Sequence, residues 1–273
     1  MNKQRWNPTY IKRVLKKDID SSMKPVLVRT DKGLGYFKAL GNPEGPHCLA
    51  REFVGTSLAD LLGISTFKYG IIHFDGAIEI QLLNGGIAQC GRGFITQKER
   101  GEVWNGSIKD LKRITNVEDI TRLVCVDTWV RNPDRYCVWK NGIPHERFDN
   151  VFLSRHSETN LVLKSFDFSH AGFCETGKAS QAYEETVYGL FPQFKEFLRE
   201  EVAKQISDKL KTIKSKHIRM IIDQIPSEWD IDAAMRDIWV EFLVTRAGFL
   251  SENFIRMIGL QDTLRQRTLF DKE

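Results

Sequence analysis

The apolar residues of this chain follow two different spacings, and the change between them lies near residue 100. Before that point apolar and polar residues alternate and turns are frequent, which is typical of short strands. From about residue 105 onward apolar residues recur every three or four positions, which is typical of helices that bury one face. The sequence therefore predicts an α+β protein with a small β-rich first part and a larger helical second part.

Each part is predicted to contain one element of the other kind. A helix is expected over about residues 46–62, closed by Gly63, and a β-hairpin is expected over residues 151–168. Asn116 is predicted to cap the first long helix of the second part, because two acidic residues follow in its first turn. The tail, 180–268, is expected to be almost entirely helical, and strands are expected near residues 26–30, 34–40, 66–74, 77–83 and 93–97.

The polar segment 97–101 separates the two parts, so we expect a division into residues 1–100 and 101–273. Lys and Arg number 40 against 36 Asp and Glu, a balance too even to indicate a nucleic-acid partner. The five cysteines form no CxxC pair, which favours free thiols in a reducing compartment. The chain shows no apolar run long enough for a membrane span and no signal-peptide pattern at its start. A cytoplasmic protein without a membrane partner is predicted.

Three residues with hard oxygen ligands lie around the predicted hairpin. Asp134 follows an Asn-Pro turn, Asn150 precedes the first strand of the hairpin, and Asp167 follows the second strand. Phosphoryl transfer needs such a set: a carboxylate that orients or deprotonates the acceptor hydroxyl, and an amide with a carboxylate that hold Mg²⁺ on the ATP phosphates. Each residue could also serve only in a turn, bonded to the local backbone. Their order and setting favour the chemical role.

A lysine suited to ATP phosphates stands late in the strand expected over residues 34–40. Tyr36 shares a face with Lys38 by the period of two, so Lys38 is predicted to emerge on a partly apolar surface. Glu52 lies on the helix that follows, beside its apolar stripe. A strand lysine steadied by a helix glutamate is the arrangement with which kinases hold phosphates. Either side chain could instead simply face solvent.

With these residues the chain resembles the HipA-like kinases, within the broader protein-kinase-like and phosphatidylinositol-kinase-like superfamily. The resemblance implies a bilobal fold, with a small antiparallel β-lobe, a larger helical lobe that carries a catalytic hairpin, and ATP with Mg²⁺ between them. The segments that carry it span nearly the whole chain in the expected order: PVLVRTDKGLGYFKAL (25–40), REFVGTSLADLLGIS (51–65), GRGFIT (91–96), NPDRY (132–136), DNVFL (149–153), SFDFSHAG (165–172), IPSEWD (225–230) and FLVTRAGFL (242–250).

The resemblance implies an ATP- and Mg²⁺-dependent phosphotransferase whose acceptor is a Ser or Thr hydroxyl of a protein. A small-molecule hydroxyl or a lipid headgroup would be chemically equivalent. The resemblance also leaves room for an antitoxin-like protein partner. It assigns roles to six residues: the phosphate-contacting Lys38 with its helix partner Glu52, the catalytic-loop Asp134 followed by Arg135, and the Mg²⁺ ligands Asn150 and Asp167.

The chain departs from the family pattern after Asp134. Family members usually carry the metal-binding asparagine about five residues after the aspartate, where this chain has Trp139. An insertion, 136–149, offers Asn141 as a rival to Asn150 for the metal. Asn141 precedes a glycine, which is a strong turn signal, whereas Asn150 leads directly into the hairpin strand. Asn150 is therefore the predicted ligand.

A second departure concerns the loop that covers the phosphates. No G-x-G-x-x-G run precedes Lys38, and Gly33 is the one glycine predicted to let the backbone approach a phosphate. This departure keeps open an alternative in which the chain is a non-catalytic scaffold, a pseudokinase.

Overall fold

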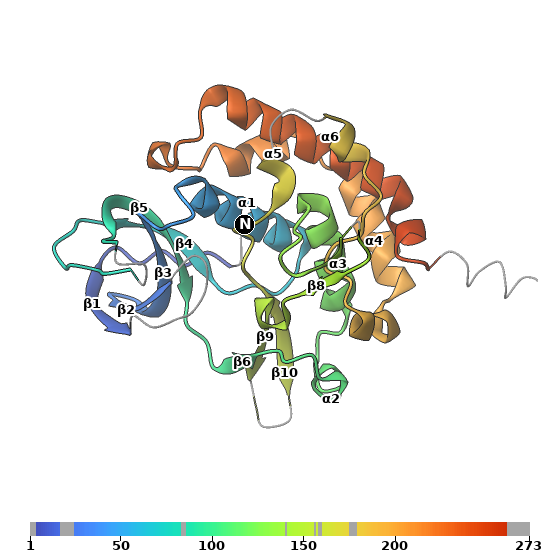
Figure 1. Ribbon diagram of the computed structural model, residues 1–273, viewed down its shortest axis with the longest axis horizontal. Helices are drawn as coiled ribbons and strands as arrows, with labels where there is room; N and C mark the ends of the chain where they lie inside the picture. The colour runs from blue at the N-terminus through green and yellow to red at the C-terminus, as the bar shows by residue number, and fades with distance from the viewer. Residues whose placement is uncertain are drawn as a thin grey trace, which may run out of the picture.

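The structure, a computed structural model, describes residues 4–16, 25–82, 86–139, 141–155, 157, 160–174 and 179–260. Five strands and one long helix come first in the chain and most of the helices follow (Figure 1), so the predicted α+β class is confirmed. The helices are α1 (His47–Leu62), α2 (Ile108–Leu111), α3 (Glu118–Val130), α4 (Glu200–Lys211), α5 (Ser215–Ile222) and α6 (Ala233–Met257). The strands are β1 (Ile11–Lys16), β2 (Val26–Thr30), β3 (Gly33–Leu40), β4 (Tyr69–Phe74), β5 (Gln89–Gln97), β6 (Gly101–Val103), β7 (Tyr136–Val138), β8 (Pro144–Glu146), β9 (Val151–Arg155) and β10 (Leu161–Ser165).

The first five strands form one antiparallel sheet in the order β1-β2-β3-β5-β4. β2 and β3 lie within a residue of their predicted bounds, while β1 is an edge strand that the sequence did not predict. Phe37 and Ala39 of β3 point into the apolar cluster on one face of the sheet. Because side chains alternate along a strand, Tyr36 and Lys38 emerge on the opposite face. The expectation for Lys38 is confirmed.

The strand predicted over residues 77–83 is wrong. The chain bends at Gly76, which has a φ of 76°, and the Asp75 carboxylate accepts a hydrogen bond from the backbone two residues further on. Ile80 and Leu82 are nevertheless buried against the sheet. The alternation of apolar residues there reflects a loop that covers the apolar cluster, not a strand paired along its length.

The protein has two apolar clusters of unequal size. The smaller cluster lies on one face of the five-stranded sheet, and the larger one runs from α1 through α3 and the β9–β10 hairpin to α6. α1 contributes Phe53 and Leu58 to the larger cluster and ends at Gly63, whose φ of 83° forms the left-handed cap that the sequence predicts. α1 is thus fixed in the core of the helical part while it also contacts β3 and β5. It can hold a side chain between the two parts.

The predicted hairpin over residues 151–168 forms, with β9 and β10 paired antiparallel. β6 extends it to a three-stranded sheet by pairing with the other edge of β9, so the chain enters its second part through a strand. The division at residues 100 and 101 stays a prediction. Asn116 does not cap α3 as predicted: its side-chain amide exchanges hydrogen bonds with the backbone of Leu163, at 2.9 Å in both directions, and fastens the start of α3 to β10.

The tail is less helical than predicted. Short 3₁₀ turns occupy residues 179–183 and 192–197, and α4 begins only at Glu200. Phe194 and Phe197, expected on the stripe of a regular helix, are buried from these turns instead. Residues 261–268 lie outside the described residues. In the part of the chain that the structure describes, no helix has the length and apolarity that a membrane span requires.

Candidate active site

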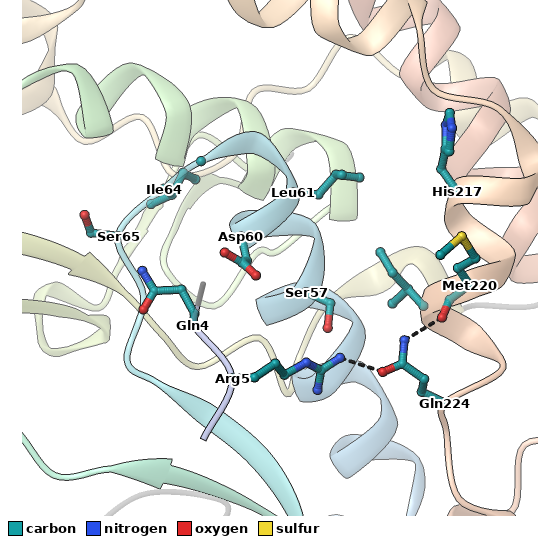
Figure 2. A pocket seen from close by; sticks show the side chains of 12 residues that line it. Gln4, Arg5, Ser57, Asp60, Leu61, Ile64, Ser65, His217, Met220 and Gln224 are labelled. Atoms are coloured by element: carbon teal, nitrogen blue, oxygen red, sulfur yellow. Dashed lines mark hydrogen bonds between the residues drawn. The ribbon is translucent and has the colours of Figure 1, made fainter. Parts of the chain in front are cut away.

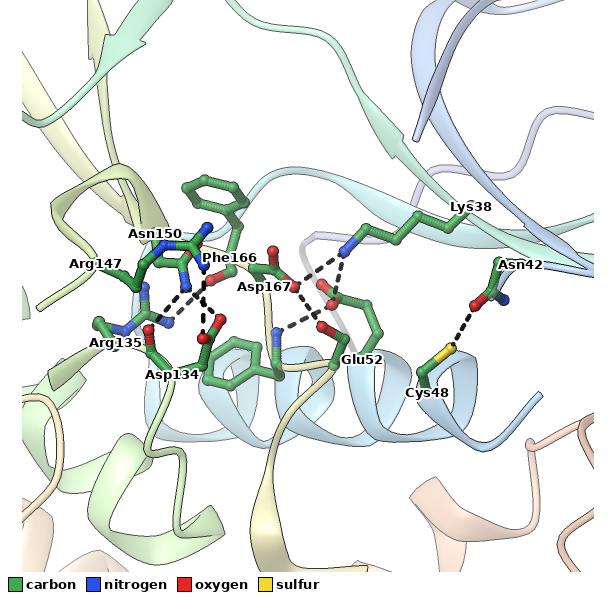
Figure 3. Close-up of polar contacts among 12 residues, drawn as sticks. Lys38, Asn42, Cys48, Glu52, Asp134, Arg135, Arg147, Asn150, Phe166 and Asp167 are labelled. Atoms are coloured by element: carbon green, nitrogen blue, oxygen red, sulfur yellow. Dashed lines mark hydrogen bonds and ion pairs between the residues drawn. The ribbon is translucent and has the colours of Figure 1, made fainter. Parts of the chain in front are cut away.

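Lys38, Glu52 and Asp167 meet between the sheet, α1 and the end of β10 (Figure 3). The Lys38 ammonium donates to Glu52 Oε2 at 2.9 Å and to Asp167 Oδ1 at 3.3 Å. Glu52 Oε2 also accepts the backbone N–H of Phe168 at 3.0 Å. All three charged side chains are buried. The glutamate therefore ties together a strand, a helix and the segment after the hairpin.

Burial opposes each of these charges, and the neighbouring charges decide the outcome. Desolvation alone would lower the pKa of Lys38, but the Asp167 and Glu52 carboxylates raise it above its ordinary value. Desolvation alone would raise the pKa of Asp167, but Lys38 and the Ser169 hydroxyl bring it well below its usual range. Burial keeps the pKa of Glu52 above its usual value despite Lys38. A cationic lysine and an ionised Asp167 are thus present at neutral pH.

Asp167 adopts an unusual backbone conformation. Its φ of 61° lies in the left-handed region, which residues other than glycine seldom adopt. The Ser169 hydroxyl donates to Asp167 Oδ1 at 2.8 Å, and the adjoining Phe168 is held by Glu52 at its N–H and packs at 0% exposure. The surrounding contacts thus impose a strained conformation, and such strain persists where the position of a side chain matters.

Asp134 and Asn150 lie next to each other, although 16 residues separate them in the chain. The Asn150 side-chain N–H donates to Asp134 Oδ2 at 2.8 Å and to the Asp134 carbonyl at 3.2 Å. The second carboxylate oxygen of Asp134 lies 3.5 Å from His145 Nε2 and 3.8 Å from Arg147 Nη1. The carboxylate is thus held by an amide and faces two basic groups (Figure 3).

Arg135 lies behind Asp134 and not in a cavity. Its side chain is fully buried, its Nε donates to Asp127 of α3 at 2.6 Å, and its Nη2 donates to the Phe166 carbonyl at 2.9 Å. Phe166 immediately precedes Asp167. Arg135 therefore joins α3, the Asp134 turn and the strained segment after β10, which makes it a positioning residue.

We expect Asp127→Asn to lower the free energy of unfolding by about 3–5 kcal/mol, because it leaves the Arg135 guanidinium buried without a counter-charge. The matched control is Asp208→Asn, which breaks an exposed pair with Lys211 and should cost at most about 1 kcal/mol. Urea denaturation of both variants measures the difference. Equal losses in the two would contradict a structural role for the buried pair.

The insertion forms a second hairpin. β7 and β8 pair antiparallel, and the Asn141 side chain accepts a hydrogen bond from the backbone of Ile143 in the turn between them, at 3.0 Å. Asn141 is exposed at this tip, whereas Asn150 is buried beside Asp134. Of the two candidates, the structure brings only Asn150 together with the other charged residues.

A cavity of about 340 Å³ joins the two groups of residues. One end is polar and the other is aromatic, where the rings of Phe67, Phe152 and Phe166 pack against each other at centroid distances of 4.9 to 6.5 Å. The polar lining comes from Lys38, Glu52, Arg147, Asp149, Asn150 and Asp167. Such a cavity has an apolar end for a flat ring and a charged end for phosphates.

Sequence reasoning missed two of these lining residues. Arg147 and Asp149 form two hydrogen bonds, at 3.0 and 3.1 Å, so the aspartate fixes the guanidinium at the mouth of the cavity. The hydrogen bonds with Asp149 raise the pKa of Arg147, with a further contribution from Asp134. Their position within three residues of Asn150 was the available signal.

Gly33 does not lie at this cavity, so its predicted approach to a phosphate is wrong. It sits in the β2–β3 turn, five residues before Lys38 on the same strand, which is roughly 17 Å along an extended chain. Pro25, at the opposite end of β2, lines the cavity instead. The connection from β1 to β2 therefore meets the sheet at the Lys38 end, but residues 17–24 lie outside the described residues.

A larger cavity, of about 720 Å³, lies on another side of α1 (Figure 2). Asp60 and Ser57 of α1 face Met220 and Gln224 across it, and Arg5 donates to Gln224 at 2.7 Å. This cavity contains none of the residues that the sequence singled out. Size alone does not make a phosphate site, and we take the smaller, charged cavity as the candidate active site.

Comparison with known proteins places the chain in a family. The family model described as HipA-like kinase matches residues 11–249. Among solved structures, the chain is similar to a Helicobacter pylori proinflammatory kinase, CtkA, with a TM-score of 0.47 and 12% sequence identity. That match covers 94% of this chain and 98% of the other. No curated protein gives a match.

Proposed function

Because the chain belongs to the HipA-like kinase family and is a phosphotransferase, we propose that it transfers the γ-phosphoryl group of ATP to a Ser or Thr hydroxyl of a protein. The carrying observation is that a single cavity is lined by the Lys38–Glu52–Asp167 group and by Asn150, which holds Asp134. We further propose that the β-rich residues 1–100 form the nucleotide-binding lobe and residues 101–273 the catalytic lobe.

Mg²⁺ fits the residues that are present. Asp167 is ionised, and Asn150 offers an amide oxygen, since its N–H group is engaged by Asp134. Neither this amide oxygen nor Asp167 Oδ2 takes part in the hydrogen bonds that the described residues make here. One carboxylate and one amide oxygen suffice for Mg²⁺ when phosphate oxygens complete its shell. We propose Asn150 and Asp167 as its ligands, where it would neutralise charge on the phosphates.

The nucleotide would lie with its base toward the aromatic end of the cavity and its phosphates toward Lys38. In this role Lys38 contacts the α- and β-phosphates, and Glu52 keeps the ammonium in place. Arg147 stands at the same polar end, fixed by Asp149, and supplies a second positive charge toward the transferred group. Fixed cations that face developing negative charge stabilise a phosphoryl-transfer transition state.

Asp134 is proposed as the group that orients the acceptor. The acceptor oxygen forms a bond to the γ-phosphorus while the bond from that phosphorus to the β–γ bridging oxygen breaks, and ADP leaves. The hydroxyl proton passes to the Asp134 carboxylate. Asn150 keeps this carboxylate in position by donating to Oδ2, and Arg135 holds the segment that carries Asp167.

Two further features belong to the proposal. A cytoplasmic site of action is supported by the free thiols at Cys48, Cys90, Cys125 and Cys137 and by the need for ATP. An antitoxin-like protein partner is what the family resemblance implies, and it stays a prediction.

Mg-ATP should raise the melting temperature of the wild-type protein, because a ligand that binds only the folded state stabilises it. Asn150→Ala should abolish most of the Mg²⁺-dependent part of this shift. The matched control is Asn141→Ala, whose loss should be confined to turn stability of about 1 kcal/mol or less. Melting curves with ATP, with and without Mg²⁺, test both variants. Loss of the Mg²⁺ effect in Asn141→Ala alone would exclude Asn150 as the ligand.

A further inference from the structure

The β7–β8 hairpin is the part of the chain that the proposed mechanism leaves unused, and it carries an exposed apolar surface. Trp139 is 49% exposed and Ile143 is 59% exposed, at the end of the hairpin. The backbone N–H of Trp139 donates to the Ile143 carbonyl at 3.0 Å, so the two residues close the ladder as its last pair. Exposed aromatic and branched side chains that adjoin one another are typical of a binding surface.

The register of the hairpin decides which way this surface faces. Cys137 pairs with His145, and the next pair on the same face lies two residues further along each strand. Trp139 and Ile143 therefore share a face with His145, and the rings of Trp139 and His145 lie in contact, with centroids 6.0 Å apart.

His145 joins this face to the proposed active site. Its Nε2 lies 3.5 Å from Asp134 Oδ1, the carboxylate that meets the acceptor hydroxyl in the proposed mechanism. The exposed apolar surface thus continues from the point of phosphate transfer outward along the hairpin. A molecule whose hydroxyl reaches Asp134 and which extends beyond it on this side contacts Ile143 and Trp139.

We propose that Trp139 and Ile143 form a docking surface for an extended segment of a protein acceptor, and that they select an apolar residue beside the phosphorylated Ser or Thr. The inference rests on the proposed function and adds the substrate class. A strand advances about 3.3 Å per residue, so Ile143 lies about 7 Å beyond His145. An extended acceptor therefore places a side chain two to four positions from its hydroxyl against this surface.

The shape of the surface favours a peptide over a small molecule. A small acceptor needs an enclosed pocket that surrounds most of its surface. Trp139 and Ile143 instead lie on the open tip of a hairpin, where only a ligand long enough to bridge from Asp134 to the tip gains contact with both.

The test uses a positional-scanning library of short peptides with a fixed central Ser or Thr, with labelled ATP and Mg²⁺. Wild-type protein should prefer a large apolar residue two to four positions to one side of the hydroxyl. Trp139→Ser and Ile143→Ser should each lose this preference and raise the KM for the preferred peptide by about tenfold, with kcat changed much less. The matched controls are Tyr183→Ser (58% exposed) and Ile87→Ser (56% exposed), which lie outside the hairpin and should keep the preference.

The outcomes separate this inference from the function on which it rests. If the wild-type protein shows no thermal shift with Mg-ATP, the proposed function itself is overturned. If Mg-ATP binds and a small hydroxyl compound accepts phosphate but no peptide does, the docking surface is overturned while the nucleotide site stands. A selectivity that is unchanged in both hairpin variants overturns it as well.

Discussion

Asp134→Asn should reduce phosphate transfer by about 10²–10⁴-fold while leaving Mg-ATP binding largely intact. The variant side chain has nearly the same shape, and its oxygen can still accept the hydrogen bond that Asn150 donates at 2.8 Å. It cannot accept the hydroxyl proton of the acceptor. The loss should therefore fall on kcat and not on the thermal shift produced by Mg-ATP.

This prediction is measured by transfer of label from ATP to peptide or protein acceptors, alongside melting curves with Mg-ATP. Asp208→Asn serves again as the control, since its carboxylate is exposed on α4. Equal rates in the wild type and in Asp134→Asn would remove Asp134 from the reaction. Wild-type protein that binds Mg-ATP and transfers phosphate to no acceptor would favour a scaffold role.

Lys38→Ala should cost about 3–5 kcal/mol of folding free energy and should abolish the Mg-ATP thermal shift. The substitution leaves the Glu52 and Asp167 carboxylates buried next to each other without a cation. It also removes the positive charge that the phosphates would meet. The two effects have different readouts, because one is measured without nucleotide and the other with it.

The pH dependence of the loss follows from the direction of the pKa shifts. In the wild type Lys38 helps to lower the pKa of Asp167, which adds stability above the unfolded value of about 3.9 and loses it as the pH falls through the folded value. In Lys38→Ala both carboxylates should have folded pKa values above their unfolded values. Their ionisation then destabilises the variant as the pH rises. The gap in unfolding free energy between wild type and variant should widen from about pH 4 to pH 7.

The double variant Lys38→Ala/Glu52→Gln separates folding from binding. It removes one of the two buried charges, so part of the lost stability should return, while the Mg-ATP shift should stay absent. Denaturation and melting curves on both variants measure this. A single variant that loses less than about 1 kcal/mol and keeps its Mg-ATP shift would place Lys38 outside the site.

Local patterns in the sequence were sufficient for the residues around Lys38. The period of two along β3 puts Lys38 opposite Phe37, and the helical stripe of α1 ends at the glycine that caps it. Asn150 was preferred over Asn141 because a strand follows it at once, and the hairpin does form there. Each of these inferences needs only a few consecutive residues.

Features that depend on distant segments could not be predicted in this way. The edge strand β1 exists because β2 offers it a partner, and β6 exists because β9 does. Arg135 reads as a catalytic-loop residue until Asp127 of α3 and the Phe166 carbonyl are seen to bind it. Gly33 carries the right residue type for phosphate but lies at the wrong end of its strand.

A crystal structure of the protein with Mn²⁺ in place of Mg²⁺ and a non-hydrolysable ATP analogue tests the central claim most directly, since the anomalous signal of the metal fixes its position. We expect the metal between the Asn150 amide oxygen and the Asp167 carboxylate, the phosphates within contact of Lys38, and the base among Phe67, Phe152 and Phe166. A nucleotide bound in the larger cavity beside Asp60, or a metal held away from Asn150 and Asp167, would contradict the proposed site.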